Sequence, residues 1–177
     1  MSRWQVHGER ALYRSDWLDL RLVDVELPSG ERFEHHVVRM PHAAVATVVR
    51  DSSRGVLLIR RHRFITDTWG WEVPAGGVDP GETPEQAARR ETVEEAGWEP
   101  GLLREVGSYF PTNGLCDQIF YVLTADEARY VSEPINSNET ERVDWATEAQ
   151  VAELIRSGEV QDGFSLTALL WTLSAGG

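Results

Sequence analysis

The order of strand and helix patterns along the chain predicts a layered fold of the α/β (α+β) class. Residues 42–49 form a β-branched apolar run, which is typical of a buried strand. A capped helix is predicted over residues 84–96, and two more helices are predicted near the C-terminus. Strands with helices on both sides, within 177 residues, favour one domain with a good-sized core and an appended element.

The net charge, the cysteine content and the lack of long apolar runs limit the partners and the location expected for the chain. The formal net charge is −12, which argues against a nucleic-acid polymer or an anionic membrane, because both need a basic surface. Cys116 is the single cysteine, so no intrachain disulfide is expected, and a lone thiol is more often a small buried hydrophobe than a nucleophile. The N-terminus has no apolar signal region and no run approaches a membrane span, so we expect a cytoplasmic protein.

The first forty residues contain strand patterns and no helix signal. Residues 18–27 alternate between apolar and polar side chains, and Pro28–Gly30 predicts a turn. Residues 32–38 would return as the hairpin partner of that strand. Residues 1–40 are therefore expected to form an N-terminal strand module.

The next strands lead to a cluster of cations. After the strand at residues 42–49, a turn at 51–55 precedes a strand over Val56–Arg63. Its end carries Arg60, Arg61, His62 and Arg63, and alternation puts Arg61 and Arg63 on one face. In so acidic a chain this cluster predicts binding of an anionic substrate. The alternative is a solvated strand end.

The stretch Gly76–Trp98 carries the strongest local signals. Thr83 and Gln86 form a capping box, Pro84 stands at the first helical position, and Gly97 is placed to end the helix. Gly76–Glu82 is expected to be a glycine-rich loop, in which the first two glycines let the backbone turn sharply.

Three carboxylates share one face of that helix. Glu91, Glu94 and Glu95 are spaced by three and four residues, where like charges repel. A divalent cation would remove the repulsion, and carboxylate oxygens suit Mg²⁺ or Mn²⁺. The alternative is a solvated acidic face. Arg90 either pairs with Glu94 at the surface or holds the other carboxylates in place.

The remainder of the chain continues the layered pattern. Strands are predicted at residues 102–110, 118–123 and 143–145, with a polar loop over 126–138. Thr147 and Gln150 form a second capping box, and Gly158 ends that helix. The last helix is predicted over residues 164–173, with buried leucines at Leu166, Leu169, Leu170 and Leu173.

Seven residues of the central stretch match one known motif. The pattern is G-x5-E-x7-R-E-U-x-E-E-x-G-U, where U is a bulky aliphatic residue, and the matching residues are Gly76, Glu82, Arg90, Glu91, Glu94, Glu95 and Gly97. Only the softer positions, Thr92 and Trp98, depart. The chain therefore resembles Nudix hydrolases, which use divalent metal to cleave a nucleoside diphosphate linked to another group. The resemblance implies an α/β/α sandwich with a mixed sheet, here over residues 41–177.

Within that family the chain is similar to ADP-ribose pyrophosphatases. The similar features are the lead-in E-V-P-A-G-G, the N-terminal strands and the loop before the strand at residue 143. The resemblance implies two or three metal ions bound by the Ala75 carbonyl, Glu91, Glu94, Glu95 and Glu141. It also implies Glu139 as the general base, with Glu94 and Glu95 as further catalytic residues, and structural support from Gly76, Glu82, Arg90 and Gly97.

Substrate contacts are less well defined. The resemblance assigns Arg63 to a phosphate, and Arg61 is expected beside it. His35 and Gln118 are also expected to bind substrate, although these two residues and Asn113 depart from the ADP-ribose pyrophosphatase pattern. ADP-ribose, cleaved to AMP and ribose 5-phosphate, is the first expectation. Another nucleoside diphosphate sugar, a dinucleotide, or a non-catalytic nucleotide-sensing module are the alternatives.

The resemblance also implies a homodimer formed through residues 1–40. Trp4, Trp17 and Phe33 lie in this segment, where exposed rings could stack on the substrate's base. The alternatives are that these rings are core residues and that the strands are an ordinary extra hairpin.

Overall fold

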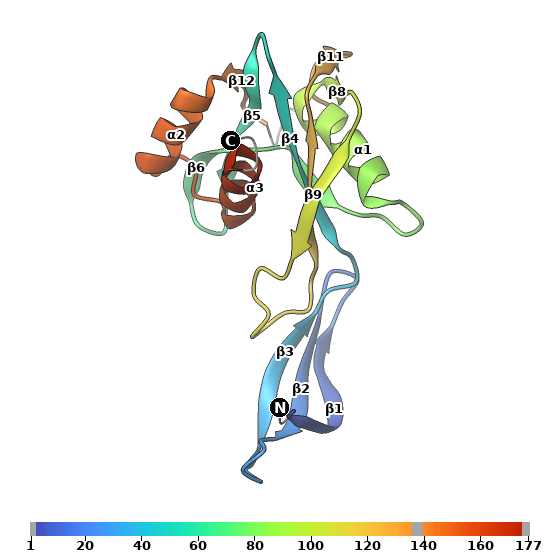
Figure 1. Ribbon diagram of the computed structural model, residues 1–177. Coiled ribbons are helices and arrows are strands. Elements are labelled where there is room, and N and C mark those ends of the chain that lie inside the picture. Colours follow the sequence, from blue (N-terminus) through green and yellow to red (C-terminus); the bar gives the residue numbers. More distant parts are fainter. Residues whose placement is uncertain (1–2, 136–139, 175–177) are drawn as a thin grey trace. The chain divides into compact units, whose positions relative to one another are not determined.

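The computed structural model describes residues 3–135 and 140–174 and divides them into two units (Figure 1). The first unit comprises the chain up to Ala43 together with Phe110–Ile119, and the second comprises the rest. Each unit is described by itself. No helix in the described ranges is long and apolar enough to cross a membrane.

The first unit is a three-stranded antiparallel sheet. Its strands are β1 (Gln5–Arg14), β2 (Asp19–Glu26) and β3 (Arg32–Arg39), with β2 in the centre. The predicted hairpin is confirmed, with Asp19 opposite Arg39 and Glu26 opposite Arg32. The segment 110–119 joins this unit through a bridge between Val38 and Cys116, which the sequence did not indicate.

Aromatic side chains remain at the surface of the first unit. Trp17 is 82% exposed, so the alternative that it is a core residue is wrong. Trp4 and Phe33 form an edge-to-face pair with ring centroids 5.9 Å apart, and Trp4 is also exposed. Cys116 is half-buried, less enclosed than a small core residue would be.

The second unit is built on a seven-stranded mixed sheet. Its main path runs β12–β5–β4–β10–β9, with β6 beside β5 and β7 beside β4. The pair β4–β10 is parallel, whereas the other pairs are antiparallel. The strands are β4 (Ala44–Asp51), β5 (Gly55–Arg63), β6 (Thr68–Glu72), β7 (Ala75–Gly77), β9 (Arg104–Tyr109), β10 (Phe120–Ala125) and β12 (Arg142–Ala146). A two-stranded sheet adds β8 (Trp98–Pro100) and β11 (Ala128–Tyr130).

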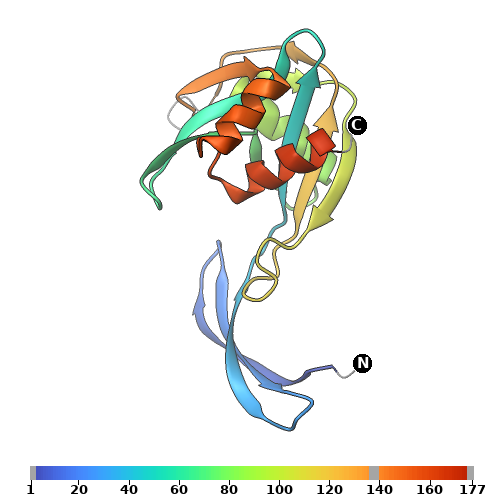
Figure 2. The same cartoon turned by 60° about the vertical axis from the view of Figure 1, so that its left-hand side comes forward.

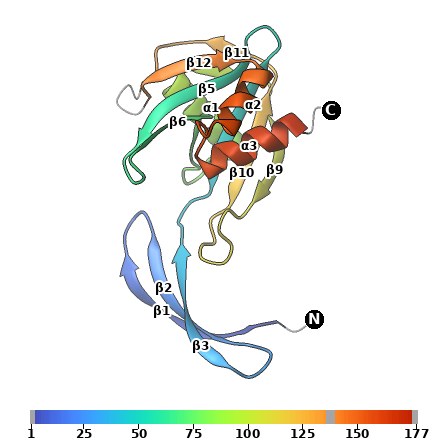
Figure 3. The same cartoon turned by 90° about the vertical axis from the view of Figure 1, so that its left-hand side faces the viewer.

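Helices cover both faces of the main sheet. Helix α1 (Pro84–Ala96) lies on one face, and α2 (Glu148–Arg156) and α3 (Gly163–Ser174) lie on the other (Figures 2 and 3). Alternate residues of β4 point to the two sides, because Val45 packs with Ala87 and Ala88 of α1, whereas Val48 packs with Leu169 of α3. The predicted α/β/α sandwich with a mixed sheet is confirmed.

Several local expectations were wrong. Leu170 is 53% exposed, because α3 buries only the stripe that faces the sheet. The short strands β6, β7, β8 and β11 were not predicted, since three to five residues are too few to show an alternation pattern. β11 interrupts the expected loop at 126–138. Gly76 and Gly77 form part of β7, and neither has a positive φ, so the expected sharp turn is absent there.

Candidate active site

Helix α1 begins and ends where the sequence predicts. The Thr83 hydroxyl accepts from the Gln86 N–H, and the Gln86 side chain accepts from the Thr83 N–H at 2.8 Å. At the other end Gly97 is left-handed, with a φ of 73°, and its N–H donates to the Val93 carbonyl. A Cβ at residue 97 would also lie 1.9 Å from the Ser132 carbonyl oxygen, so glycine is required there.

Gly76 is required for a different reason. β7 passes so close to α1 that a Cβ at residue 76 would lie 2.1 Å from the carboxyl carbon of Glu91. A Cβ at the neighbouring Gly77 would contact nothing within 4 Å. The missing side chain of Gly76 therefore makes the space that the Glu91 carboxylate occupies.

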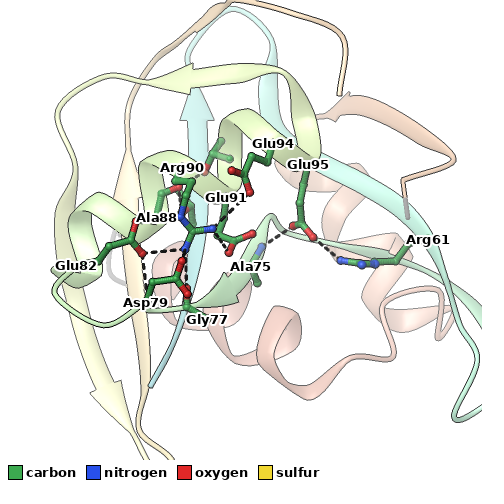
Figure 4. A network of polar contacts seen from close by, with 12 residues as sticks. Arg61, Ala75, Gly77, Asp79, Glu82, Ala88, Arg90, Glu91, Glu94 and Glu95 are labelled. Atoms are coloured by element: carbon green, nitrogen blue, oxygen red, sulfur yellow. Dashed lines mark hydrogen bonds and ion pairs between the residues drawn. The ribbon is translucent and has the colours of Figure 1, made fainter. Parts of the chain in front are cut away.

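Arg90 holds the acidic residues of the box in place (Figure 4). Its guanidinium donates two hydrogen bonds of 2.9 Å to the Glu82 carboxylate and one of 2.6 Å to Glu91. It also reaches the Gly77 carbonyl at 2.9 Å, and Glu94 at 3.4 Å. Both interpretations of Arg90 are thus present at once, because it pairs with Glu94 and also braces the loop against the helix.

Glu95 has a different partner, which comes from the sheet. One carboxylate oxygen accepts from the Ala75 N–H at 2.9 Å, and the other accepts from Arg61 Nη1 at 2.5 Å. Both side chains of this ion pair are buried. Figure 4 shows Glu95 turned toward Arg61, on the side of α1 away from Arg90.

Burial changes the proton affinity of these carboxyls. Desolvation raises the pKa of Glu95 to about 7, against the opposing effects of Arg61 and the Ala75 N–H. Desolvation likewise raises the pKa of Glu91, although Arg90 opposes it. Glu82 is at the surface, and its hydrogen bonds from Arg90 lower its pKa to about 2. Glu95 and Glu91 are therefore harder to ionise than an ordinary glutamate, and a nearby cation would favour their ionised forms.

Arg63 lies beyond Arg61 at the end of β5. It forms a bidentate pair with Glu72 on β6, at 2.8 and 2.5 Å, and this pairing raises the pKa of Arg63. Arg61, Arg63 and Glu72 line a pocket of about 760 Å³, together with Thr68 and Asp162. Glu72 was not predicted as a site residue. It lies opposite Ile59 in the β5–β6 pair, so its side chain is on the same face of the sheet as Arg61.

Comparison with known proteins decides the family. Residues 40–166 match the NUDIX domain, and residues 4–38 match the nucleoside diphosphate sugar hydrolase N-terminal domain. The chain belongs to the Nudix family. The matched region holds all seven fixed residues of the box.

Two curated relatives and one solved structure are similar to this chain. A CMP-5'-(N-acetyl-N-hydroxy-3-aminopropyl)phosphonate hydrolase of Streptomyces rubellomurinus is 41% identical over 99% of this chain and 84% of its own length. An ADP-ribose pyrophosphatase of Bacillus subtilis is 30% identical over 92% of this chain and 88% of its own length. The crystal structure of an ADP compounds hydrolase has the same fold, with a TM-score of 0.87 at 20% identity, covering 99% of this chain and 95% of that chain. This protein is a Nudix hydrolase.

Nudix enzymes generally use divalent metal ions, and the donors in this site fit such an ion. Carboxylates and the backbone carbonyl of Ala75 are hard oxygen donors. The absent Cβ of Gly76 leaves room for the Glu91 carboxylate beside β7. Within the described residues no three acidic, histidine or cysteine side chains form a ready-made cage, because Arg90 and Arg61 pair with the carboxylates instead.

Two loop residues, Glu139 and Glu141, were predicted to belong to this site. Glu139 is outside the described residues. The Glu141 carboxylate is half-exposed and lies 3.7 Å from Arg60 Nε. The backbone N–H of Glu141, just before β12, donates to the Arg60 carbonyl. Glu141 thus contacts β5, the strand that also carries Arg61. Its ion pair is with Arg60, whose side chain lies on the opposite face of β5 from Arg61.

His35 and Gln118 belong to the first unit. The His35 ring Nε2 lies 3.0 Å from the Gly114 carbonyl oxygen, and the Gln118 amide donates to the His42 carbonyl at 3.0 Å. Both side chains therefore join the 110–119 segment to the N-terminal strands. Asn113 lines a pocket of about 770 Å³ in the same unit, beside Trp4 and Val25.

Proposed function

We propose that this Nudix hydrolase cleaves the phosphoanhydride bond between a nucleoside monophosphate and a second phosphorus acid. The supporting observation is that Arg61 pairs with the buried carboxylate of Glu95 on α1 and also lines, with Arg63, one pocket at the end of β5. Carboxylates bind divalent metal ions, and arginines bind phosphate groups. Hydrolysis of a phosphoanhydride uses both kinds of positive charge to neutralise the phosphates.

The chain's residues divide the work as follows. Glu91, Glu94, Glu95 and the Ala75 carbonyl hold two or three Mg²⁺ or Mn²⁺ ions, with Glu141 as a further ligand. When bound, such ions neutralise phosphate charge and lower the pKa of a coordinated water. Arg63 binds a phosphate, with Glu72 fixing its guanidinium plane. Glu139 accepts the proton of the attacking water.

ADP-ribose is the proposed substrate, with AMP and ribose 5-phosphate as products. The E-V-P-A-G-G lead-in, the N-terminal strand unit and the relative of 30% identity support it. A second candidate is a CMP-linked phosphonate, because a hydrolase of such a compound is 41% identical over nearly the whole chain. His35, Asn113 and Gln118 depart from the ADP-ribose pyrophosphatase pattern, which weakens the case for ADP-ribose itself.

A substrate panel tests the proposal. ADP-ribose, a CMP-alkylphosphonate, a nucleoside diphosphate sugar and a dinucleotide are each incubated with Mg²⁺, and products are separated by chromatography. We expect a nucleoside monophosphate from at least one of them at a kcat/KM of about 10⁴ M⁻¹s⁻¹ or more. A protein that releases no nucleoside monophosphate from any of the four compounds, but hydrolyses a nucleoside triphosphate assayed beside them, would contradict the proposed substrate class.

A further inference from the structure

Asp162, directly before α3, lines the pocket of about 760 Å³ that Arg63 and Glu72 also line. Its Oδ2 atom accepts two hydrogen bonds of 2.8 Å, one from the N–H and one from the hydroxyl of Ser165. Its backbone carbonyl accepts from the Leu166 N–H, so Asp162 caps the helix. Because both side-chain bonds go to Oδ2, the cap does not use Oδ1.

Ser165 ties this carboxylate to the segment between β6 and β7. The Ser165 side chain is fully buried, and its hydroxyl, which donates to Asp162, also accepts from the Val73 N–H at 3.2 Å. Val73 is buried as well, and it directly follows Glu72, the partner of Arg63. The Asp162 carboxylate and the Arg63 guanidinium are therefore held in a fixed relation within one pocket.

The pocket thus carries charges of both signs. Glu72 chiefly raises the pKa of Arg63 through its hydrogen bonds, and the negative charge of Asp162 adds to the effect, so Asp162 lies within electrostatic reach of Arg63. A carboxylate repels a phosphate, but it accepts hydrogen bonds from hydroxyl groups. Asp162 therefore suits an uncharged, hydroxyl-bearing part of a nucleotide that adjoins the phosphates.

The tip of the β5–β6 hairpin adds apolar surface to the same pocket. Phe64 and Ile65 line it, and each side chain is 83% exposed. The neighbouring Thr66 makes the polar contacts of the turn, to the Arg63 carbonyl and to the Thr68 hydroxyl. Apolar walls with a few fixed polar groups are the usual composition of a small-molecule site.

We propose that Asp162 binds hydroxyl groups of a sugar ring of the nucleotide substrate, while Arg63 binds the adjoining phosphate. A sugar ring has hydroxyl donors at its edge and carbon-bound hydrogens on its faces, which match the carboxylate and the apolar hairpin tip. Asp162 then determines specificity, and Ser165 positions it. The inference rests on the proposed function, because ADP-ribose has one such ring on each side of the phosphoanhydride.

Non-hydrolysable nucleotides test this contact. The full analogue is methylene-bridged ADP-ribose. One truncated analogue has a propyl group in place of the terminal ribose, and the other has a 2′,3′-dideoxy nucleoside. Each is titrated by calorimetry, in Mg²⁺, into the wild type, Asp162→Asn and Asp162→Ser. Asparagine and serine also cap helices well, so both variants keep the start of α3.

We expect the wild type to bind the full analogue about tenfold more tightly, or better, than one of the truncated analogues, because hydrogen bonds to a charged carboxylate are strong. In both Asp162 variants this preference should fall to within about threefold. The truncated analogue should bind the variants at least as tightly as the wild type, since they lack a negative charge near the phosphates. The truncation that loses the preference identifies the sugar that Asp162 binds.

Asp67→Asn is the matched control for the loss of one negative charge. The Asp67 side chain is 94% exposed in the β5–β6 turn, and its φ of 52° is a conformation that asparagine adopts readily. This variant should keep the wild-type preference.

A preference that is absent from the wild type, or unchanged in the Asp162 variants, would overturn the inference. Equal weakening of the full and truncated analogues in those variants would also overturn it, because a structural defect affects every ligand alike. No titration depends on turnover. If the preference is lost as expected while no member of the substrate panel is hydrolysed, the proposed reaction fails and the sugar contact stands.

Discussion

The Glu95 carboxyl is buried, and desolvation raises its pKa. The free energy of unfolding, measured without metal, should therefore depend on the ionisation of Glu95. Its folded pKa is about 7, against 4.5 for an ordinary glutamate. Between these two values the folded state retains a proton that the unfolded state has lost, so the free energy of unfolding falls as pH rises. The pair with Arg61 reduces this cost without abolishing it.

We therefore expect Glu95→Gln to gain stability relative to the wild type as pH rises from about 4.5 to about 7, by up to about 3 kcal/mol. Urea denaturation in the presence of a chelator, at pH 5 and pH 8, measures the difference. A stability difference that is the same at both pH values would show that Glu95 ionises normally.

The general base is the other residue-scale question. Glu139→Gln should lower kcat by about 10²–10⁴-fold with little change in KM, because it removes proton transfer without removing substrate contacts. Steady-state kinetics on the preferred substrate measure this, with Glu141→Gln as the matched variant two residues away. A loss of less than about threefold would assign the role to Glu141 or to a box glutamate.

Sequence reasoning at this scale identified residues better than it identified their partners. The box predicted that Glu91, Glu94 and Glu95 share a helix face, because helical spacing is regular. It did not predict that Arg61 would pair with Glu95, since that contact joins residues 34 positions apart on different elements. Glu72 was missed because its pairing with Arg63 depends on the register of β5 and β6, and β6 was not predicted.

At the scale of elements, the close approach of β7 to α1 shapes the site. Gly76→Ala should lower kcat/KM on the order of 10²-fold, because its Cβ would overlap the Glu91 carboxylate and displace this proposed metal ligand. Gly77→Ala is the control, since its Cβ would meet nothing and its activity should stay near the wild-type value. Equal activities of the two variants would show that the position of Glu91 is unimportant.

The helices were predicted closely and the short strands were not. Caps and the αL glycine are local signals, so both ends of α1 could be predicted from Thr83, Gln86 and Gly97. β7 forms only because β4 offers hydrogen-bond partners to Ala75–Gly77, and such long-range pairing leaves little trace in three residues. The glycine at position 76 was consequently predicted to allow a sharp turn, whereas in the structure it makes room for the Glu91 carboxylate.

At the scale of the whole molecule, we propose that the N-terminal strand unit forms a homodimer interface. Trp4 and Val6 are exposed on this unit and line one pocket together with Val23 and Val25, and contiguous apolar surface of this kind marks an interaction site. Light scattering at micromolar concentration should give about twice the chain mass of 19.9 kDa. The mass of a single chain, unchanged on dilution or concentration, would contradict this proposal.

The central claim is that hydrolysis requires the carboxylate of Glu95 on α1. Comparing the rates of the wild type and one variant tests it most directly. Glu95→Gln and the wild type are assayed in Mg²⁺ on the substrate that the panel identifies, with circular dichroism to confirm that both are folded. The account predicts that the variant loses most of its activity, on the order of 10²-fold or more, as the wild type does when a chelator is added. A folded Glu95→Gln protein that hydrolyses the substrate at the wild-type rate would show that the carboxylates of α1 are not the active site.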